Sequence, residues 1–304
     1  FPLHTLAFCK NSITRGALLE RHLWSGRLPP EAIWETDHGV QVVSPLFTLL
    51  TLAPYVSETQ LLMMAYEMCG TFAVFRPSDL IEKSLKDAYA SHQLPGDFGW
   101  KRSANQKGEA TDLWQRPPLI QIDDLLDYAE SNRSRRGGKK LLNAARQVRG
   151  VTAFPFEVQA SMLFGLSRRL GGEGLLHFEN NYEIALDQKA KKIVNKDKVY
   201  ADLHFVSAEG DRSVIVECQG ATEHGKVDAG IRDADRATAL QSMGYDVILL
   251  TYEKMSDKDS FRTVAEMLAN KLGYPYRPKT DAMKAREDEL RRELLIDWAT
   301  LGEF

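Results

Sequence analysis

The sequence predicts an α/β protein with a mixed central sheet flanked by helices, and a smaller α+β domain at its N-terminal end. In residues 151–275, short apolar runs alternate with stretches of helical periodicity, as in α/β folds. The 304 residues leave room for two domains. The composition, 43% hydrophobic and 27% charged, is that of an ordinary globular protein.

Changes in residue composition and patterning divide the chain into four segments. Residues 1–76 are rich in apolar residues, and residues 77–150 are polar and interrupted by glycine and proline. Residues 151–275 alternate in α/β fashion, and residues 276–304 contain a charged amphipathic helix. We expect an N-terminal domain, a connector of helices and loops, a larger domain and a C-terminal helix. The apolar side of that last helix could pack on a second copy of the chain, so a homodimer is one expectation.

The N-terminal and middle segments predict strands at 1–9 and 39–43, and strand or helix at 13–24. Ser44 and Pro45 are an N-cap and first-turn pair, so a helix should begin there, and a second helix should follow over 57–69. The middle segment predicts short helices over 80–89 and 122–129.

The third segment begins with a predicted helix over 155–170 and a strand over 182–186. Strands 199–206 and 213–219 flank a turn at 208–211, which predicts a hairpin. A helix over 229–243 should end at Gly244. The apolar run that follows, in 246–252, predicts a strand buried on both faces. Residues 260–272 predict a further helix.

Composition restricts the classes of protein and the compartment. Three cysteines, without CxxC spacing, favour a reducing compartment and argue against a disulfide framework or a zinc site. No apolar run reaches about 18 residues, so a membrane span is not expected. The first residues do not resemble a signal peptide, and we expect a cytoplasmic protein. The formal charge of −3 and the pI near 6.2 give no overall nucleic-acid signature.

Two carboxylates in the predicted hairpin form the candidate site. Side chains alternate along a strand, so Glu217 and Gln219 point to one face and Cys218 to the other. If the apolar faces of the hairpin pack together, Asp202 lies on the same side as Glu217. Converging carboxylates suit Mg²⁺, which prefers oxygen ligands and keeps several waters. The alternative is that both are edge carboxylates paired with Lys198 or Arg212.

The order of these motifs resembles the PD-(D/E)XK nuclease superfamily, particularly the branch related to very-short-patch-repair endonucleases. The residues that carry the resemblance are Glu157 in a helix, Asp202 in a strand, the run Glu217-Cys218-Gln219-Gly220, His224, the span from Asp228 to Arg232-Asp233, and Gly244-Tyr245-Asp246-Val247. The resemblance implies a restriction-endonuclease-like core over about 120 residues. It implies catalytic roles for Glu157, Asp202, Glu217 and Gln219, and Mg²⁺ or Mn²⁺ bound by Asp202, Glu217 and the carbonyl of Cys218.

The sequence departs from the family at position 219. The superfamily usually has Lys there and this branch usually has Asp, whereas Gln219 cannot act as a general base. Some restriction enzymes of the fold also carry Gln at this position, and Lys226 could substitute for the missing lysine if its loop folds back.

Local basic charge marks candidate nucleic-acid contacts. Residues 131–198 hold 14 Lys/Arg against 6 Asp/Glu, a local charge of +8. The alternative is that the basic run, residues 133–149, is a solvated face, that His224 is a surface residue, and that Arg232 and Arg236 pair along their own helix. The candidate contacts are His224, Lys226, Arg232, Arg236, Arg135, Arg136, Lys139 and Lys140.

The N-terminal segment has a resemblance of its own. His22-Leu23-Trp24, Leu28-Pro29 and the stretch from Gly39 to Leu50 are similar to the central region of AbiEi-type abortive-infection antitoxins. In that family a strand followed by Ser-Pro comes after a DNA-binding winged helix and is often joined to the nuclease-like domain. The resemblance implies a scaffold rather than chemistry.

Three functions follow from these observations. The first is a Mg²⁺-dependent nuclease acting on nucleic acid, most readily DNA, in phage defence or DNA repair. The second is a nucleic-acid-binding regulator, antitoxin-like, that keeps the nuclease fold without its chemistry, as Gln219 suggests. The third is an enzyme of another class with a pocket in residues 1–76, where no phosphate-binding loop, HxxxH spacing or nucleophile elbow is present.

Overall fold

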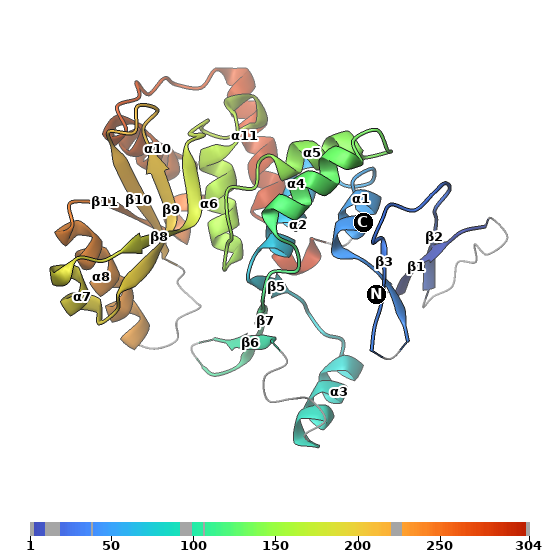
Figure 1. Cartoon of the computed structure of the whole chain (residues 1–304). Helices are drawn as coiled ribbons and strands as arrows, with labels where there is room; N and C mark the ends of the chain where they lie inside the picture. Colours follow the sequence, from blue (N-terminus) through green and yellow to red (C-terminus); the bar gives the residue numbers. More distant parts are fainter. Residues whose placement is uncertain are drawn as a thin grey trace. The chain divides into compact units, whose positions relative to one another are not determined.

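The computed structural model describes residues 3–9, 19–37, 39–91, 99–105, 107–219 and 227–301, except for the side chains of residues 89 and 227–233. The chain forms two compact units, Phe1–Thr48 and Leu49–Phe304 (Figure 1). The boundaries predicted at 76, 150 and 275 all lie inside the second unit.

The first unit contains two small two-stranded sheets. Strand β1 (Leu3–Ala7) pairs in parallel with β2 (Leu19–Leu23), and β3 (Ile33–Glu35) pairs antiparallel with β4 (Gln41–Val43). The segment predicted as strand or helix is therefore a strand where it is described, and residues 13–18 lie outside the described residues. Helix α1 (Pro45–Leu52) begins as expected, since Ser44 Oγ accepts the Phe47 N–H at 3.3 Å.

Helices form one part of the second unit. Helix α2 (Glu58–Cys69) starts with a capping box between Ser57 and Gln60 and packs on α5, α6 and α11. Seven of its twelve residues are buried, so α2 is a core helix rather than an amphipathic surface helix. The helices around it are α4 (Ile122–Ser131), α5 (Gly138–Ala145), α6 (Pro155–Gly165) and α11 (Asp281–Leu294).

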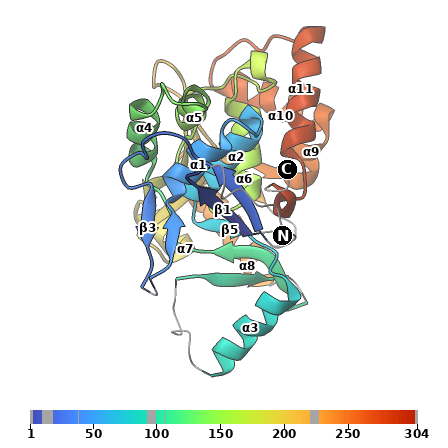
Figure 2. The same ribbon diagram turned by 90° about the vertical axis from the view of Figure 1, so that its right-hand side faces the viewer.

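A three-stranded antiparallel sheet lies beside these helices. Its order is β5-β7-β6, from β5 (Phe72–Val74), β7 (Ala110–Gln115) and β6 (Lys101–Ala104). The 2.5 Å ion pair of Arg102 with Glu82 ties β6 to α3 (Asp79–Ala90), and Figure 2 shows α3 beside this sheet. The sequence predicts only helices and loops in this segment, so β6 and β7 are additions to that prediction.

The predicted mixed sheet is present and flanked by helices, as expected. Its order is β11-β10-β9-β8, with β10 and β11 parallel and the other neighbours antiparallel. The strands are β8 (Phe178–Ala185), β9 (Lys198–Val206), β10 (Ser213–Gln219) and β11 (Asp246–Thr251). The remaining helices are α7 (Gln188–Val194), α8 (Val227–Ser242), α9 (Tyr252–Ser256) and α10 (Lys258–Lys271).

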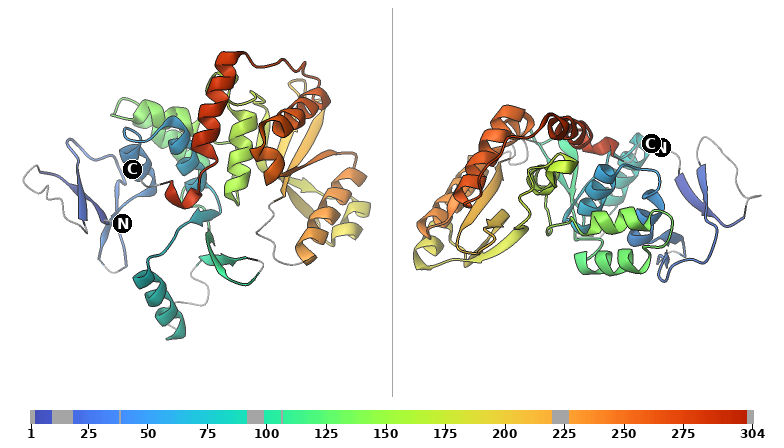
Figure 3. Two further views of the ribbon diagram at one scale, coloured as in Figure 1. Left: turned by 180° about the vertical axis from the view of Figure 1, so that it is seen from behind. Right: turned by 90° about the horizontal axis from the view of Figure 1, so that it is seen from above.

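Helices cover both faces of this sheet (Figures 1 and 3). On one face, Phe164 of α6 packs on Phe205 of β9 and on Phe261 of α10, with ring centroids 5.6 Å and 4.7 Å apart. On the other face, Ile215 of β10 packs with Leu240 of α8. The inner strand β10 is therefore buried on both sides, which places Glu217 in the interior.

One burial prediction is wrong. The apolar run in β11 was expected to be buried on both faces, but Leu249 is 38% exposed while Ile248 and Leu250 are buried. The reason is topological, because β11 is an edge strand and helices do not cover its outer face completely. The predicted hairpin of β9 and β10 is confirmed, with Gly210 at a φ of 74° in its turn.

The C-terminal helix is shorter than predicted and its apolar side is occupied. Helix α11 ends at Leu294, and a 3₁₀ turn follows at Trp298–Thr300. Leu294 and Trp298 are buried, and Trp298 Nε1 donates to Glu67 Oε2 of α2 at 2.7 Å. The face that suggested a homodimer is thus covered by the chain itself. Among the described residues, none of the helices has both the length and the hydrophobicity to span a membrane.

Candidate functional site

The candidate site lies where strands β9 and β10 separate. Their ladder pairs Val216 with Leu203, and Glu217 and Asp202 are the next residues on the two strands. In place of the next ladder bond, Asp202 Oδ2 accepts the backbone N–H of Cys218 at 2.7 Å. The Asp202 side chain therefore replaces a main-chain acceptor and is held rigidly between two inner strands.

Glu217 is a buried carboxylate with a cationic partner. Its side chain is 3% exposed, and it forms an ion pair with Arg236 of α8. The same guanidinium lies 3.8 Å from Asp202 Oδ1, so one arginine serves both carboxylates. Arg236 was predicted to hold phosphates or to pair within its own helix, whereas in the structure it crosses to the sheet.

Glu157 approaches the same region from the first turn of α6. Its Oε2 accepts the N–H of Ala153 at 2.7 Å, and the residue is 6% exposed. Ser161, one turn later, donates to the Glu157 carbonyl and accepts from the side chain of Asn180 at 2.7 Å. Asn180 also donates to the Asp202 carbonyl at 3.2 Å. Asn180 and Ser161 were not predicted, yet they join α6, β8 and β9 through the main-chain carbonyls of Glu157 and Asp202.

The pKa of the Cys218 thiol reflects the charged groups near this part of β10. Burial raises its pKa well above the usual value, and the charges of Asp202, Glu157 and Glu217 raise it further, while Arg236 opposes them. As possible ligands, however, Glu157, Asp202 and Glu217 do not form a group with atoms within 4.8 Å of one another; among the described residues, His4, Glu20 and His22 do. The structure brings Asp202 and Glu217 together at Arg236, and the participation of Glu157 in the same site stays a prediction.

The alternative partners of the two carboxylates are wrong. Lys198 pairs with Glu183 at 2.6 Å, and Arg212 lies 3.9 Å from Asp211. Asp202 and Glu217 are also not edge residues, because β9 and β10 are the inner strands of the sheet.

The remaining predicted residues of the site are only partly visible. Gln219 is the last residue of β10, opposite Thr251, and is half-buried. His224 and Lys226 lie outside the described residues, as does Gly220. Arg232 belongs to α8, but its side chain is not among those described.

Side chains of the basic run make contacts within the second unit. Lys140 donates to the carbonyl of Val56 at 2.6 Å, and the Arg136 guanidinium lies 5.2 Å from the centre of the Tyr55 ring. Arg135 is half-buried and Lys139 is exposed. Most of these residues lie on or just before α5, which packs on α2 and α4, on the side of α6 away from the mixed sheet (Figure 1). The run therefore forms a surface separate from the carboxylates.

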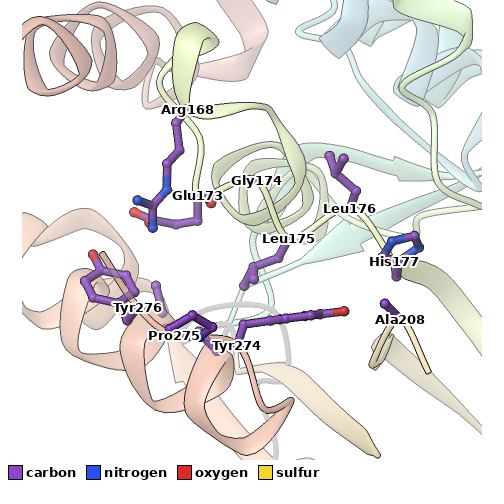
Figure 4. A pocket seen from close by; sticks show the side chains of 12 residues that line it. Arg168, Glu173, Gly174, Leu175, Leu176, His177, Ala208, Tyr274, Pro275 and Tyr276 are labelled. Carbon is purple, nitrogen blue, oxygen red and sulfur yellow. Dashed lines mark hydrogen bonds and ion pairs between the residues drawn. The ribbon is translucent and has the colours of Figure 1, made fainter. Parts of the chain in front are cut away.

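A cavity of about 280 Å³ lies at the other end of the sheet, where β9 leads into its turn. Figure 4 shows Arg168 and Glu173 on one side of it, and His177 and Ala208 on another, with Tyr274 between. Its lining is mainly apolar and, as far as the structure describes it, includes none of the predicted site residues.

Sequence reasoning missed one further cluster of possible ligands. His4, Glu20 and His22 of the first unit have ligand atoms within 4.8 Å of one another. A search for ligands one helical turn apart, such as HxxxH, cannot find it because the three residues come from two paired strands.

Comparison with known proteins gives no relative: no protein-family model, curated protein or solved structure matches the chain.

Proposed function

We propose that the chain is a metal-dependent, nuclease-like protein that hydrolyses phosphodiesters of nucleic acid, with DNA as the first substrate to test. The observation that carries the proposal is the pair of carboxylates Asp202 and Glu217, which lie side by side where two inner strands separate and which share one guanidinium, that of Arg236. Burial of two neighbouring carboxylates costs free energy of folding unless a cation neutralises them.

The donor set fits a hard divalent cation. Carboxylate oxygens and the main-chain carbonyl of Cys218 are ligands that Mg²⁺ and Mn²⁺ accept. Asp202 and Glu217 would hold the ion, and Glu157 would complete the site directly or through a water. A bound divalent ion supplies an activated water and neutralises the charge that develops on the phosphate.

The residues around the ligands have separate tasks in this proposal. The hydrogen bond from the Cys218 N–H fixes the Asp202 carboxylate before substrate arrives. The Gln219 side chain, two residues beyond Glu217 on the same face of β10, orients the attacking water through its amide and does not take its proton. Arg236 pairs with both carboxylates, and its guanidinium would be available to a substrate phosphate if a bound ion neutralised them instead.

Arg236 also favours a second candidate of another class. Its guanidinium already neutralises Glu217 and approaches Asp202, and Gln219 provides no general base. An antitoxin-like regulator that binds nucleic acid without hydrolysing it would need neither a metal ion nor a general base at this site. In that case Arg236 is the permanent counter-ion of the site.

A cleavage assay with matched variants separates the two candidates. Purified protein is incubated with single- and double-stranded DNA and with RNA, in Mg²⁺ and in Mn²⁺. The nuclease proposal expects cleavage that Asp202→Asn abolishes and Gln219→Lys keeps or raises. If neither the wild type nor Gln219→Lys cuts any substrate, the nuclease proposal fails. Salt-dependent binding that Asp202→Asn leaves unchanged would then establish the regulator.

A further inference from the structure

We propose that the first unit binds one Zn²⁺ ion between His4, Glu20 and His22, and that the ion ties strand β1 to strand β2. Each of the three residues offers one ligand atom, and all three atoms lie within 4.8 Å of one another. The site shares no residue with the carboxylates of the second unit, so a test of it is independent of the proposed nuclease function.

The parallel register brings the three side chains together. His4 is opposite Glu20, and Leu6 is opposite His22. Alternate residues of a strand share a face and paired residues lie side by side, so His4, Glu20 and His22 all project from one face of the ladder. Convergence therefore follows from the pairing itself.

The chemistry of the donors selects the ion. Two imidazole nitrogens and one carboxylate oxygen form the ligand set of many zinc sites in which water takes the fourth position. An all-oxygen ion such as Mg²⁺ is a poor match for two imidazoles. His4 and His22 are both exposed and Glu20 is half-buried, so the site is open to solvent and a water ligand has access.

The distances require only a small adjustment. His4 Nδ1 and His22 Nε2 are 2.8 Å apart and share a hydrogen bond, with the two rings stacked at 5.1 Å. Two nitrogens on one tetrahedral zinc, each about 2.05 Å from the ion, are about 3.3 Å apart. The nitrogens must therefore separate by roughly half an ångström, which a small rotation of two exposed side chains provides.

A zinc ion bound here would stabilise the pairing of β1 with β2. Within the described residues β1 and β2 form a sheet of only two strands, five residues each. An isolated two-stranded sheet is marginal in water, and parallel pairing is slightly weaker per residue than antiparallel pairing. Zinc would replace the single hydrogen bond between the rings with three metal–ligand bonds across the ladder.

The test measures binding and its effect on the strands. The full chain is prepared without a polyhistidine tag, stripped with a chelator, and carries Cys9→Ser so that this exposed thiol cannot capture the ion. Zn²⁺ binding is followed by calorimetry, and amide hydrogen exchange is followed in residues 3–7 and 19–23. We expect one equivalent of Zn²⁺ at this site and slower exchange in both strands when it is bound.

Variants identify the ligands. In zinc sites, loss of a residue that only hydrogen-bonds to a ligand weakens metal affinity roughly 10–100-fold. Loss of a ligand itself should cost at least as much, so Glu20→Gln and His22→Ala should each lower the Zn²⁺ affinity of this site by at least about tenfold. Glu35→Gln, on an exposed strand of the same unit, and His177→Ala, in the second unit, should leave it unchanged. Any Zn²⁺ that occupies the other acidic site is recognised by its loss in Asp202→Asn.

Two results would overturn the proposal. One is that the wild type binds no more Zn²⁺ than Glu20→Gln and His22→Ala do. The two histidines would then be a hydrogen-bonded pair only. The other is bound Zn²⁺ that does not change exchange in residues 3–7 and 19–23, which would show that the ion does not tie the two strands.

Discussion

Replacement of Arg236 by methionine is the most direct test of the buried acidic site. Methionine keeps much of the apolar volume but removes the cation that pairs with Glu217, whose side chain is 3% exposed. At an effective dielectric constant of about 20, the 3.8 Å contact with Asp202 alone corresponds to about 4 kcal/mol of Coulomb attraction. Loss of one partner of a buried ion pair costs about 3–5 kcal/mol. We take the lower end, about 3 kcal/mol, because Arg236 is 28% exposed and water can replace part of its contribution.

The assay is urea unfolding followed by circular dichroism, with and without Mg²⁺. A loss of about 3 kcal/mol should lower the midpoint by roughly 1 M. Mg²⁺ at about 100 times its dissociation constant for Arg236→Met should stabilise that variant by about 2.7 kcal/mol. The same Mg²⁺ concentration should stabilise the wild type less, because there the ion must displace the guanidinium and its dissociation constant is higher. The control is Arg146→Met, whose ion pair with Glu130 is exposed and worth little. An unchanged midpoint in Arg236→Met, or equal stabilisation of both proteins by Mg²⁺, would refute the reasoning.

Three further predictions concern buried charge. Lys279→Met, which leaves two buried carboxylates without their shared cation, should lower the free energy of unfolding by about 3–5 kcal/mol, whereas the exposed Lys284→Met should have almost no effect in the same urea titration. Burial and nearby carboxylates raise the pKa of the Cys218 thiol, so at pH 8 iodoacetamide should label exposed Cys9 much faster; equal rates by mass spectrometry would contradict this. Burial lowers the pKa of His204, so only the unfolded chain takes up that proton as the pH falls through about 6.5. Stability should therefore fall between pH 7 and 5 in the wild type, and less in His204→Phe; parallel profiles would exclude a contribution from this histidine.

Local features of the sequence predicted the elements that depend on local structure. The cap at Ser44, the turn at Gly210 and the alternation in β9 and β10 involve residues close in sequence. These signals were sufficient to place the hairpin and therefore to bring Asp202 beside Glu217.

Features that depend on distant pairing could not be predicted in the same way. The exposure of Leu249 follows from the position of β11 at the edge of the sheet, which the apolar run does not encode. The pairing of Arg236 with Glu217 depends on how α8 lies across the sheet. The three-stranded sheet was missed because β5 and β7 pair Phe72 with Gln115, and its strands are too short for a clear alternation.

The packing of helix α11 has a consequence for the folding of the second unit during synthesis. Lys279 donates to the Gly171 carbonyl, and Trp298 donates to Glu67 of α2, so residues synthesised after the other elements of the second unit fill positions in its interior. Until they emerge, the nascent chain exposes part of the core around α2 and leaves the buried Glu173 without its lysine. A stop codon before this helix should therefore yield a chain that engages chaperones and is degraded, rather than a trimmed but functional protein.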